Sequence, residues 1–539
     1  MAREEGYAPS AHEESLVGTV EHGFDRAHLL KSAAGLVAAS GLGSLLAACG
    51  GKKTQAGAGG AEPKRGGTIK IALGDASSGD SLDPGKLLTS LDATVHGMVY
   101  DNLIRLDQSF RPHPALAETW ETSRDARVWT FRLRKGVEYH DGRTLHADDV
   151  AYMMRRNLDP RSGSGGLQVF SPYLAPSGID LVDPRTIRFR LKAPNAFFVQ
   201  ALGGFYGRVY PAGTTRFAHA VGTGPFKAVS FEPGVGFEVA RNPNYWESGL
   251  PYLDGIRGVV IFEPSTKAQG LLTGDLDAID FPEYSTLPQL QSSSNVHLYR
   301  ARGGAQLTIA LDATSPHYHD VRVRRAMKML LDREKFYSVV FHDQGDISAD
   351  VPIPPNDAFY PHDVQPLPHD PEQARSLLRQ AGLGDGFSET VYTTNVDPGM
   401  VNAAVVAKSM WADGRVQASV SQRNADDFYT HIWLQKPAVV GYFLRQHVST
   451  VMQFVFASRG PWNESHWHSA GTDKLILEAQ STTDEARQKE LWGEALREIN
   501  EQSGEISMHV HRLYPTKKRL RGLELNWTDI AQFRRAYLA

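Results

Sequence analysis

The sequence predicts a large protein of the mixed α/β class, and three observations point to it. The chain has 539 residues, 41% of them hydrophobic and 9% aromatic, which is enough to form about two to four packed units. Short segments in which polar and apolar residues alternate, as in half-buried strands, dominate the first half. Amphipathic segments that begin with helix-capping residues become frequent in the second half.

The predicted strands fall mainly before residue 300. Residues 128–134 (VWTFRLR) and 186–192 (TIRFRLK) alternate with period two. Residues 226–231 and 235–241 flank Glu232-Pro233-Gly234, which predicts a hairpin because Pro and Gly favour tight turns.

Three segments in the second half predict helices. Asp370-Pro371 opens one with an N-cap and a proline at the first position, and Gly382 ends it. A second begins within residues 482–485 and continues with an apolar face to Ile499. Residues 321–337 (VRVRRAMKMLLDREKFY) predict a single helix. We place a boundary between two parts of the chain near Arg300, joined by continuous strands because no flexible linker marks it.

Composition and charge exclude several functional classes. The 57 basic and 61 acidic residues give a net charge of -4, so the basic character of nucleic-acid-binding proteins is missing. No apolar run reaches the roughly 18–20 residues of a membrane span, which excludes a polytopic membrane protein. One cysteine rules out a disulfide framework and a cysteine-rich metal site.

The single cysteine lies at the end of an apolar leader. Residues 33–48 (AAGLVAASGLGSLLAA) carry no charge and match the length of a signal-peptide core. Leu46-Ala47-Ala48-Cys49 resembles a bacterial lipobox, so we predict that residues 1–49 are a lipoprotein-type signal peptide with Cys49 as the lipidation site. The alternative is a buried helix with a structural thiol. Residues 50–65 are rich in Gly and Ala and predict a flexible tether.

The export route stays open. Six acidic residues precede Arg26, whereas signal peptides usually begin with basic residues. The segment from Arg26 to Lys31 resembles a twin-arginine signal, but Ala27 stands where the second arginine belongs. Two questions therefore stay open. One is whether Met1 is the true start of the protein, and the other is whether export follows the Sec or the twin-arginine route.

A series of different short motifs follows in a characteristic order from about residue 66 onward. They are GTIKIA (67–72), SLDP (81–84), YDNLI (100–104), PALAETW (114–120), HDG (140–142), GTGPF (222–226), RNPNYW (241–246), GDLD (274–277) and DVRVRRA (320–326). Each motif is weak alone, but the ordered set resembles the family 5 extracellular solute-binding proteins, the peptide/nickel/opine class that serves ABC importers.

The resemblance implies the two-lobed periplasmic-binding-protein fold of the large, dipeptide/oligopeptide-binding type, with mixed sheets in each lobe. Lobe I would comprise residues 66–300, including an extra subdomain at about 85–220. Lobe II would comprise residues 301–505, and residues 506–539 would return to lobe I. The ligand would be enclosed between the lobes by hinge closure.

The resemblance also implies a ligand-binding segment in lobe II. Peptide-binding relatives carry a Gly-Trp pair followed three residues later by an Asp that pairs with the ligand's ammonium group. The matching positions here are Gly441, Tyr442 and Arg445, with His447 in the same segment. Because an arginine fork suits a carboxylate or phosphate, we predict an anionic ligand. The alternative is that Arg445 forms a surface or inter-lobe ion pair.

Further candidates lie outside that segment. Trp467 belongs to an aromatic and amide-rich stretch, residues 457–468, suited to stacking and hydrogen bonding. Asp83 and Tyr100 fall in segments that line the cleft in relatives. His466 and His468, like His509 and His511, are spaced as strand neighbours that could chelate, but neither pair has a third ligand at a telling spacing, so we predict no metal site and no cofactor.

These observations predict a binding protein and not an enzyme, since the sequence contains no Gly-x-Ser-x-Gly, His-Glu-x-x-His or Walker-type motif. We expect an extracytoplasmic, lipid-anchored monomer that binds a peptide-like or opine-like small molecule and delivers it to ABC permease subunits, with no nucleic-acid partner. A ligand sensor or chaperone-like protein without transport, and a secreted hydrolase, are the alternatives.

Overall fold

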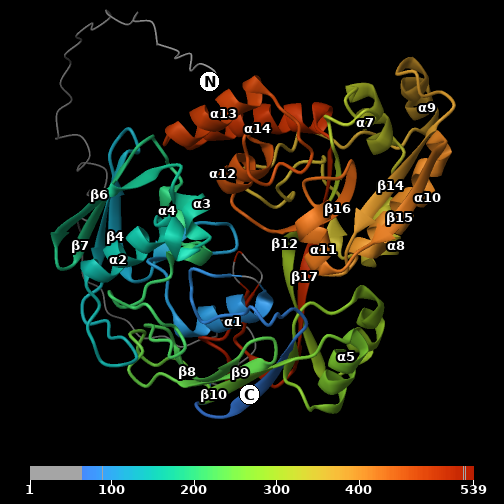
Figure 1. Cartoon of the computed structure of the whole chain (residues 1–539). Helices are drawn as coiled ribbons and strands as arrows, with labels where there is room; N and C mark the ends of the chain where they lie inside the picture. The colour runs from blue at the N-terminus through green and yellow to red at the C-terminus, as the bar shows by residue number, and fades with distance from the viewer. Residues whose placement is uncertain (1–62, 88, 526, 528–529) are drawn as a thin grey trace, which may run out of the picture. The chain divides into compact units, whose positions relative to one another are not determined.

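An 11-stranded mixed sheet runs through the part of the chain that the structure describes (Figure 1). The computed structural model describes residues 63–539, apart from 88, 526, 528 and 529. Along the main path the strand order is β15-β14-β16-β12-β17-β11-β1-β10-β9-β8, and β13 pairs with β17. The strands are β1 (Thr68–Leu73), β8 (Phe226–Glu232), β9 (Gly236–Arg241), β10 (Gly255–Val260), β11 (Ala278–Ile279), β12 (Val296–Leu311), β13 (Gly345–Asp346), β14 (Phe387–Thr393), β15 (Val416–Gln422), β16 (Ala438–Leu444) and β17 (Glu505–Lys517).

Two long antiparallel strands, β12 and β17, connect the two ends of this sheet. The first part of β12, up to Ala301, pairs with the end of β17 that lies beside β11. From Ala305 onward β12 also pairs with β16 on its other side. The register shifts between Ala301 and Ala305, where Gly303 has φ +62°. A bulge therefore lies where the sheet passes from one set of strands to the other.

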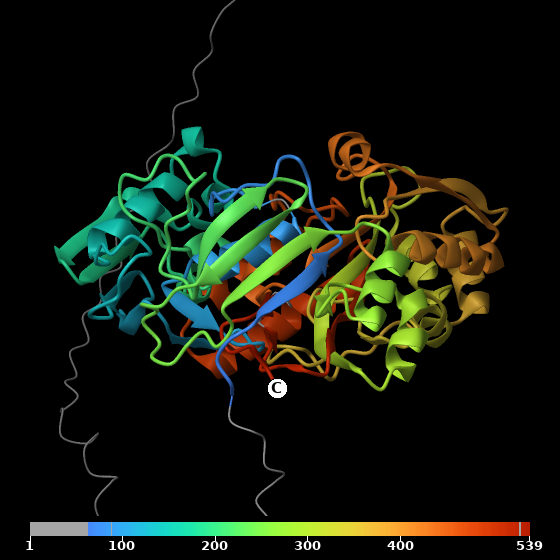
Figure 2. The same ribbon diagram turned by 90° about the horizontal axis from the view of Figure 1, so that it is seen from below.

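The first lobe is built on strands β1 and β8–β11, which lie side by side in Figure 2 as the blue and green arrows. Its core also takes in α1 (Ser90–Val99) and C-terminal residues such as Tyr514 and Phe533.

A separate four-stranded sheet, in the order β4-β5-β7-β6, packs into the same core. Its strands and helices are β4 (Ala117–Thr122), β5 (Val128–Leu133), β6 (Leu174–Asp183), β7 (Thr186–Leu191), α2 (Ala147–Asn157), α3 (Gly166–Phe170) and α4 (Phe198–Leu202). The predicted alternation is confirmed, since Phe131 and Phe189 are fully buried while Arg132 and Arg190 are exposed.

The second lobe surrounds β14–β16 with helices. Its two apolar clusters contain fully buried tryptophans, Trp411 in one and Trp492 in the other. The helices are α7 (Val321–Met329), α8 (Arg333–Phe341), α9 (Pro371–Gln380), α10 (Met400–Trp411), α11 (Ala425–Asp427), α12 (Val448–Val451), α13 (Ala470–Ser481) and α14 (Glu485–Gln502).

The remaining elements belong with the first lobe or flank the join between the lobes. They are β2 (Ile104–Leu106), β3 (Pro112–Pro114), α5 (Pro264–Thr273), α6 (Leu287–Ser292), β18 (Leu520–Arg521), β19 (Glu524–Leu525), β20 (Ala531–Gln532) and β21 (Tyr537–Leu538).

Most predicted elements are confirmed and one is wrong. Strands β8 and β9 form the expected hairpin, and Asp370 caps α9 by accepting from the Gln373 N–H at 2.9 Å. The single helix predicted over 321–337 is two helices, α7 and α8. The chain leaves α7 after Met329, and Asp332 begins α8 by accepting from the Lys335 N–H at 3.0 Å. A local cap therefore competes with continuation of the helix.

The predicted signal peptide, Cys49 and nearly all of the predicted tether lie outside the described residues. Within residues 63–539, less the four positions left out, none of the helices has the length and apolar composition needed to cross a bilayer. The lobe boundaries at 300 and 505 fall inside β12 and at the first residue of β17, and they remain proposals.

Candidate ligand-binding cleft

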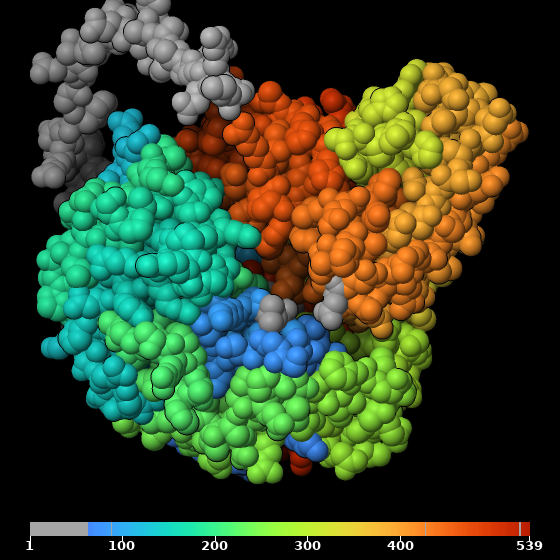
Figure 3. Space-filling model, in the orientation of Figure 1, coloured from blue at the N-terminus to red at the C-terminus, as the bar shows by residue number. Residues whose placement is uncertain are grey.

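An aromatic cavity of about 260 Å³ lies between segments of the two lobes. Figure 3 shows the surface hollowed between the blue segment around α1 and the orange segments of the second lobe. The first lobe contributes Phe110, Phe205 and Tyr206, and the second lobe contributes Trp433, Tyr442 and Trp462. Apolar walls with a few polar groups are typical of small-molecule sites.

Trp433 is held in the wall of this cavity by a buried carboxylate. Its indole Nε1 donates to Glu464 Oε2 at 2.7 Å, and the Thr308 hydroxyl donates to the other carboxylate oxygen. Glu464 is 3% exposed, and burial raises its pKa to about 7. The hydrogen bond fixes the plane of the indole, because an indole has one N–H and therefore one donor direction.

Gly441 leaves the space that Glu464 occupies. A Cβ at this position of β16 would lie 2.9 Å from Glu464 Oε2 and 3.1 Å from the Thr308 hydroxyl oxygen. Both distances are shorter than ordinary carbon–oxygen contacts. A larger residue at 441 would therefore push the Glu464 carboxylate away from its present place, so glycine is favoured here by the close approach of that carboxylate and not by backbone conformation.

Tyr442 and His447 both line the aromatic cavity. Burial raises the pKa of Tyr442 well above its usual value, and the charges of Asp75 and Asp397 act in the same direction. His447 caps α12, where its Nδ1 accepts from the Ser449 N–H at 3.2 Å. Burial, and then the charge of Arg445, lowers the pKa of His447 to about 3, so its imidazole is neutral at physiological pH.

Arg445 is buried and faces an aspartate. Its guanidinium lies 3.4 Å from Asp357 Oδ2 and 5.3 Å from the centre of the Phe110 ring. Burial raises the pKa of Asp357, and the opposing effect of Arg445 is smaller. Arg445 does not belong to the described lining of the aromatic cavity. Arg445 thus forms an ion pair, as the alternative expected, but the pair is buried and joins two residues within 301–505 and is neither at the surface nor between the lobes.

The other predicted residues occupy structural positions. Asp83 forms a two-pronged ion pair with Arg156, at 2.9 and 2.5 Å, and Tyr100 donates to the Leu82 carbonyl at 2.9 Å. Trp467 is 5% exposed and packs in an apolar cluster of the second lobe. From the same loop it is Trp462 that reaches the cavity.

A second cavity of about 160 Å³ adjoins the first and shares Leu87, Tyr442 and Leu444 with it. Its charged lining residues are Asp75, Lys267, Asp280, Glu283, Asp397 and Arg512. Lys267 Nζ lies 2.8 Å from Asp280 Oδ1, and Arg512 is paired with Asp397. Asp75 Oδ2 accepts from the Ser90 N–H at 2.9 Å. None of these four acidic residues is among the site residues predicted from the sequence.

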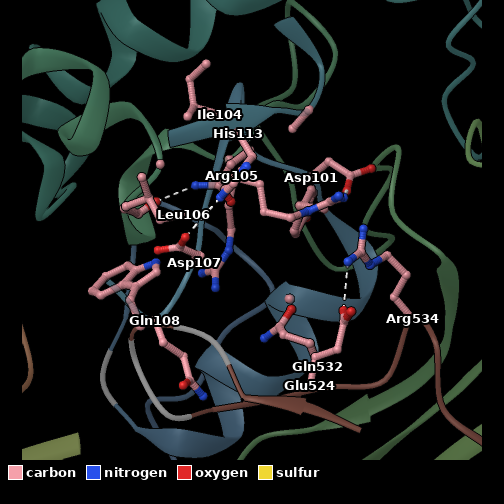
Figure 4. A pocket seen from close by; sticks show the side chains of 18 of the residues that line it. Asp101, Ile104, Arg105, Leu106, Asp107, Gln108, His113, Glu524, Gln532 and Arg534 are labelled. Atoms are coloured by element: carbon pink, nitrogen blue, oxygen red, sulfur yellow. Dashed lines mark hydrogen bonds and ion pairs between the residues drawn. The ribbon is translucent and has the colours of Figure 1, made fainter. Parts of the chain in front are cut away.

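A larger cavity, of about 710 Å³, lies within the first lobe beside β2, β3 and the C-terminal strands (Figure 4). Its charged groups bind one another. Arg534 contacts Glu247 and Glu524 at 2.8 and 2.7 Å, Arg105 contacts Glu247 at 2.7 Å, and His113 contacts Asp107 at 3.0 Å. Because these side chains neutralise each other and come from one lobe, the smaller inter-lobe cavities are the better candidates for ligand binding.

No metal centre stands out in the part of the chain that is described, where no three His, Cys, Asp or Glu side chains are grouped to hold an ion. The histidine pairs noted in the sequence have other contacts. His466 lies 3.3 Å from Asp312, and His509 Nε2 lies 2.8 Å from the Val351 carbonyl.

Comparisons with known proteins agree with this architecture. A family model described as bacterial extracellular solute-binding proteins, family 5 (middle), matches residues 111–446. The chain is 27% identical over 469 residues to heme-binding protein A of Haemophilus influenzae, covering 79% of this chain and 84% of that protein. It is 26% identical over 484 residues to di/tripeptide-binding protein 2 of Pseudomonas aeruginosa, covering 82% and 88%.

Solved structures show the same fold. The periplasmic binding protein DppA of Helicobacter pylori, in complex with the peptide STSA, matches with a TM-score of 0.77 at 22% identity, covering 88% of this chain and 98% of that one. AgaA from A. tumefaciens R10, in complex with agropinic acid, matches with a TM-score of 0.77 at 21% identity, covering 88% and 99%. The predicted two-lobed fold is therefore confirmed.

Proposed function

Because this chain belongs to the bacterial extracellular solute-binding proteins of family 5, we propose that it is an extracytoplasmic receptor that captures a peptide-like or opine-like small molecule and delivers it to an ABC importer. Its curated relatives are solute-binding proteins, so its action would be capture and release of an unaltered ligand. The ABC permease subunits would recognise the ligand-bound form.

The observation that carries this proposal is the aromatic cavity formed by side chains of both lobes. A ligand that contacts Phe205 on one side and Trp433 on the other stabilises the arrangement in which the lobes are close together. The bulge in β12 between Ala301 and Ala305 lies in one of the two strands that join the lobes and is the natural place for bending.

The lining favours a peptide-like ligand with apolar or aromatic side chains. Rings such as those of Tyr206, Trp433 and Trp462 offer stacking surfaces for such groups. The expected anionic ligand rested on Arg445, whose guanidinium is directed at Asp357. The proposal therefore includes no anion-binding role for Arg445.

The decisive test starts with freshly purified full-length protein. Native mass spectrometry is expected to detect one small molecule bound per chain and released intact on denaturation. Incubation with a pool of short peptides should leave them uncleaved, whereas new fragments would indicate a hydrolase. Deletion of the gene should abolish uptake of the ligand, and undiminished uptake would favour a sensor without transport.

We further propose that Cys49 carries the lipid that attaches the protein to the membrane. Cys49→Ala should move the protein from the membrane fraction to the soluble fraction, because no other cysteine can be acylated. Metabolic labelling with a fatty acid should mark the wild-type protein and not the variant. Retention of the variant on membranes would contradict the assignment.

A further inference from the structure

The smaller inter-lobe cavity has more negative than positive groups. Four carboxylates line it, and its two cationic side chains, Lys267 and Arg512, are each already paired with a carboxylate. Asp75 and Glu283 form no ion pair with a described lysine, arginine or histidine, which leaves a negative potential in the cavity.

One buried carboxylate oxygen in this lining also lacks a donor. Asp397 binds Arg512 through Oδ2, but its Oδ1 accepts no hydrogen bond from a described residue. The Asp397 side chain is only 4% exposed. A buried acceptor without a donor is costly, so a donor brought by a ligand would gain free energy here.

We propose that this acidic cavity is a subsite for a cationic group of the ligand, a primary ammonium or a guanidinium, held between Asp75 of the first lobe and Asp397 of the second. The inference rests on the proposed function, because it assigns one end of the ligand captured in the cleft. A cation that bridges carboxylates of both lobes would favour the closed arrangement.

The sizes of the two cavities agree with this division. A cavity of about 160 Å³ is similar in size to one that holds a benzene-sized group, which is room for a charged head group and not for a whole peptide. The ligand's apolar body would continue past Tyr442 and Leu444, which line both cavities, into the aromatic cavity. The Tyr442 ring lies at the junction, where it can also contact an organic cation.

Asp75 gives the subsite a dependence on pH. Burial raises the pKa of Asp75 to about 7, the Ser90 N–H opposes this, and the charges of Asp280, Asp80 and Asp397 add to it. The other charged or titratable groups around the cavity are Lys267, Glu283, Tyr429, Tyr442 and Arg512. A cation needs the ionised carboxylate, so the affinity for a lysine ammonium, which stays charged over this range, should rise about tenfold between pH 6 and pH 8. The affinity for an α-ammonium should rise less, because that group itself begins to lose its proton near pH 8.

The test uses the full-length protein and three pools of di- and tripeptides made from Phe, Leu and Ala. One pool has free amino termini, the second is N-acetylated, and the third is N-acetylated but carries one lysine. Titration calorimetry is run on the wild type, on Asp75→Asn and on Asp413→Asn, which removes an exposed carboxylate of the second lobe as the matched control. Asparagine at 75 can still accept from the Ser90 N–H, so the variant should fold.

We expect the wild type and the control to bind the free-amine pool at least tenfold more tightly than the acetylated pool. Asp75→Asn should lose that difference, and it should also lose the part of the rise in affinity between pH 6 and pH 8 that comes from ionisation of Asp75. Recovery of binding in the lysine pool would assign the subsite to a side-chain ammonium. Equal binding of all pools by the wild type would overturn the subsite and leave the proposed function standing. If no pool binds, the peptide-receptor proposal fails together with the subsite.

Discussion

Replacing Glu464 with alanine is expected to weaken ligand binding about tenfold or more. The substitution leaves the Trp433 indole N–H and the Thr308 hydroxyl without their acceptor, each at a cost of about 1–3 kcal/mol. Trp433 would then lose its fixed orientation in the cleft, and a misplaced tryptophan anchor commonly costs a large share of binding energy. Calorimetry with the molecule recovered from the purified protein measures the loss.

Glu464→Gln is the matched control. Its amide oxygen can accept from Trp433 while its NH₂ group donates to the Thr308 hydroxyl, so both contacts survive. With 5-fluorotryptophan incorporated, the resonance missing in Trp433→Phe identifies Trp433. That signal should shift in Glu464→Ala and stay near its wild-type position in Glu464→Gln. Wild-type affinity in Glu464→Ala would show that this carboxylate does not position the cleft wall.

Replacing Arg445 with alanine is expected to lower the free energy of unfolding by about 3–5 kcal/mol, the usual cost of breaking a buried ion pair from one side. The reason is Asp357, which is 8% exposed and would remain buried without its cation. Urea denaturation followed by circular dichroism measures the change.

The double variant Arg445→Ala/Asp357→Ala is expected to be less unstable than the sum of the single variants, because neither charge is left alone. Asp357→Asn tests the other half of the pair. If Arg445 instead held an anionic ligand, Arg445→Ala would keep its stability and lose affinity. The two readouts therefore separate the ion pair from the anion site.

Local patterns predicted the strands and caps correctly where neighbouring residues decide the outcome. The period-two alternation of residues 128–133 and 186–191 follows from burial of one sheet face, and the Asp370 cap follows from its own side chain. The prediction of a single helix over 321–337 was wrong, although the spacing of apolar residues continues through this stretch. Asp332 caps the start of a second helix and so interrupts the first.

The cleft was harder to predict, since it is made by segments far apart in the chain. Gly441 was singled out with the ligand segment, but its need for space comes from Glu464, which only the fold brings beneath it. In the loop at 457–468, the sequence favoured Trp467, whereas Trp462 faces the cavity. Asp75 and Asp397 each follow closely after a strand, β1 and β14, and acidic residues at strand ends were a signal that could have been used.

The sequence by itself determined the α/β class, because hydrophobic periodicity and turn residues act over short distances. The family followed from the resemblance of its ordered motifs to those of the family 5 solute-binding proteins. Only the tertiary structure decided which charges remain available to a ligand. Arg445 is matched by Asp357, 88 residues away, whereas Asp75 and the Oδ1 atom of Asp397, whose Oδ2 already binds Arg512, line one cavity and have no described cation as partner. Pairing of buried charges is a property of three-dimensional proximity, so no linear pattern could assign it.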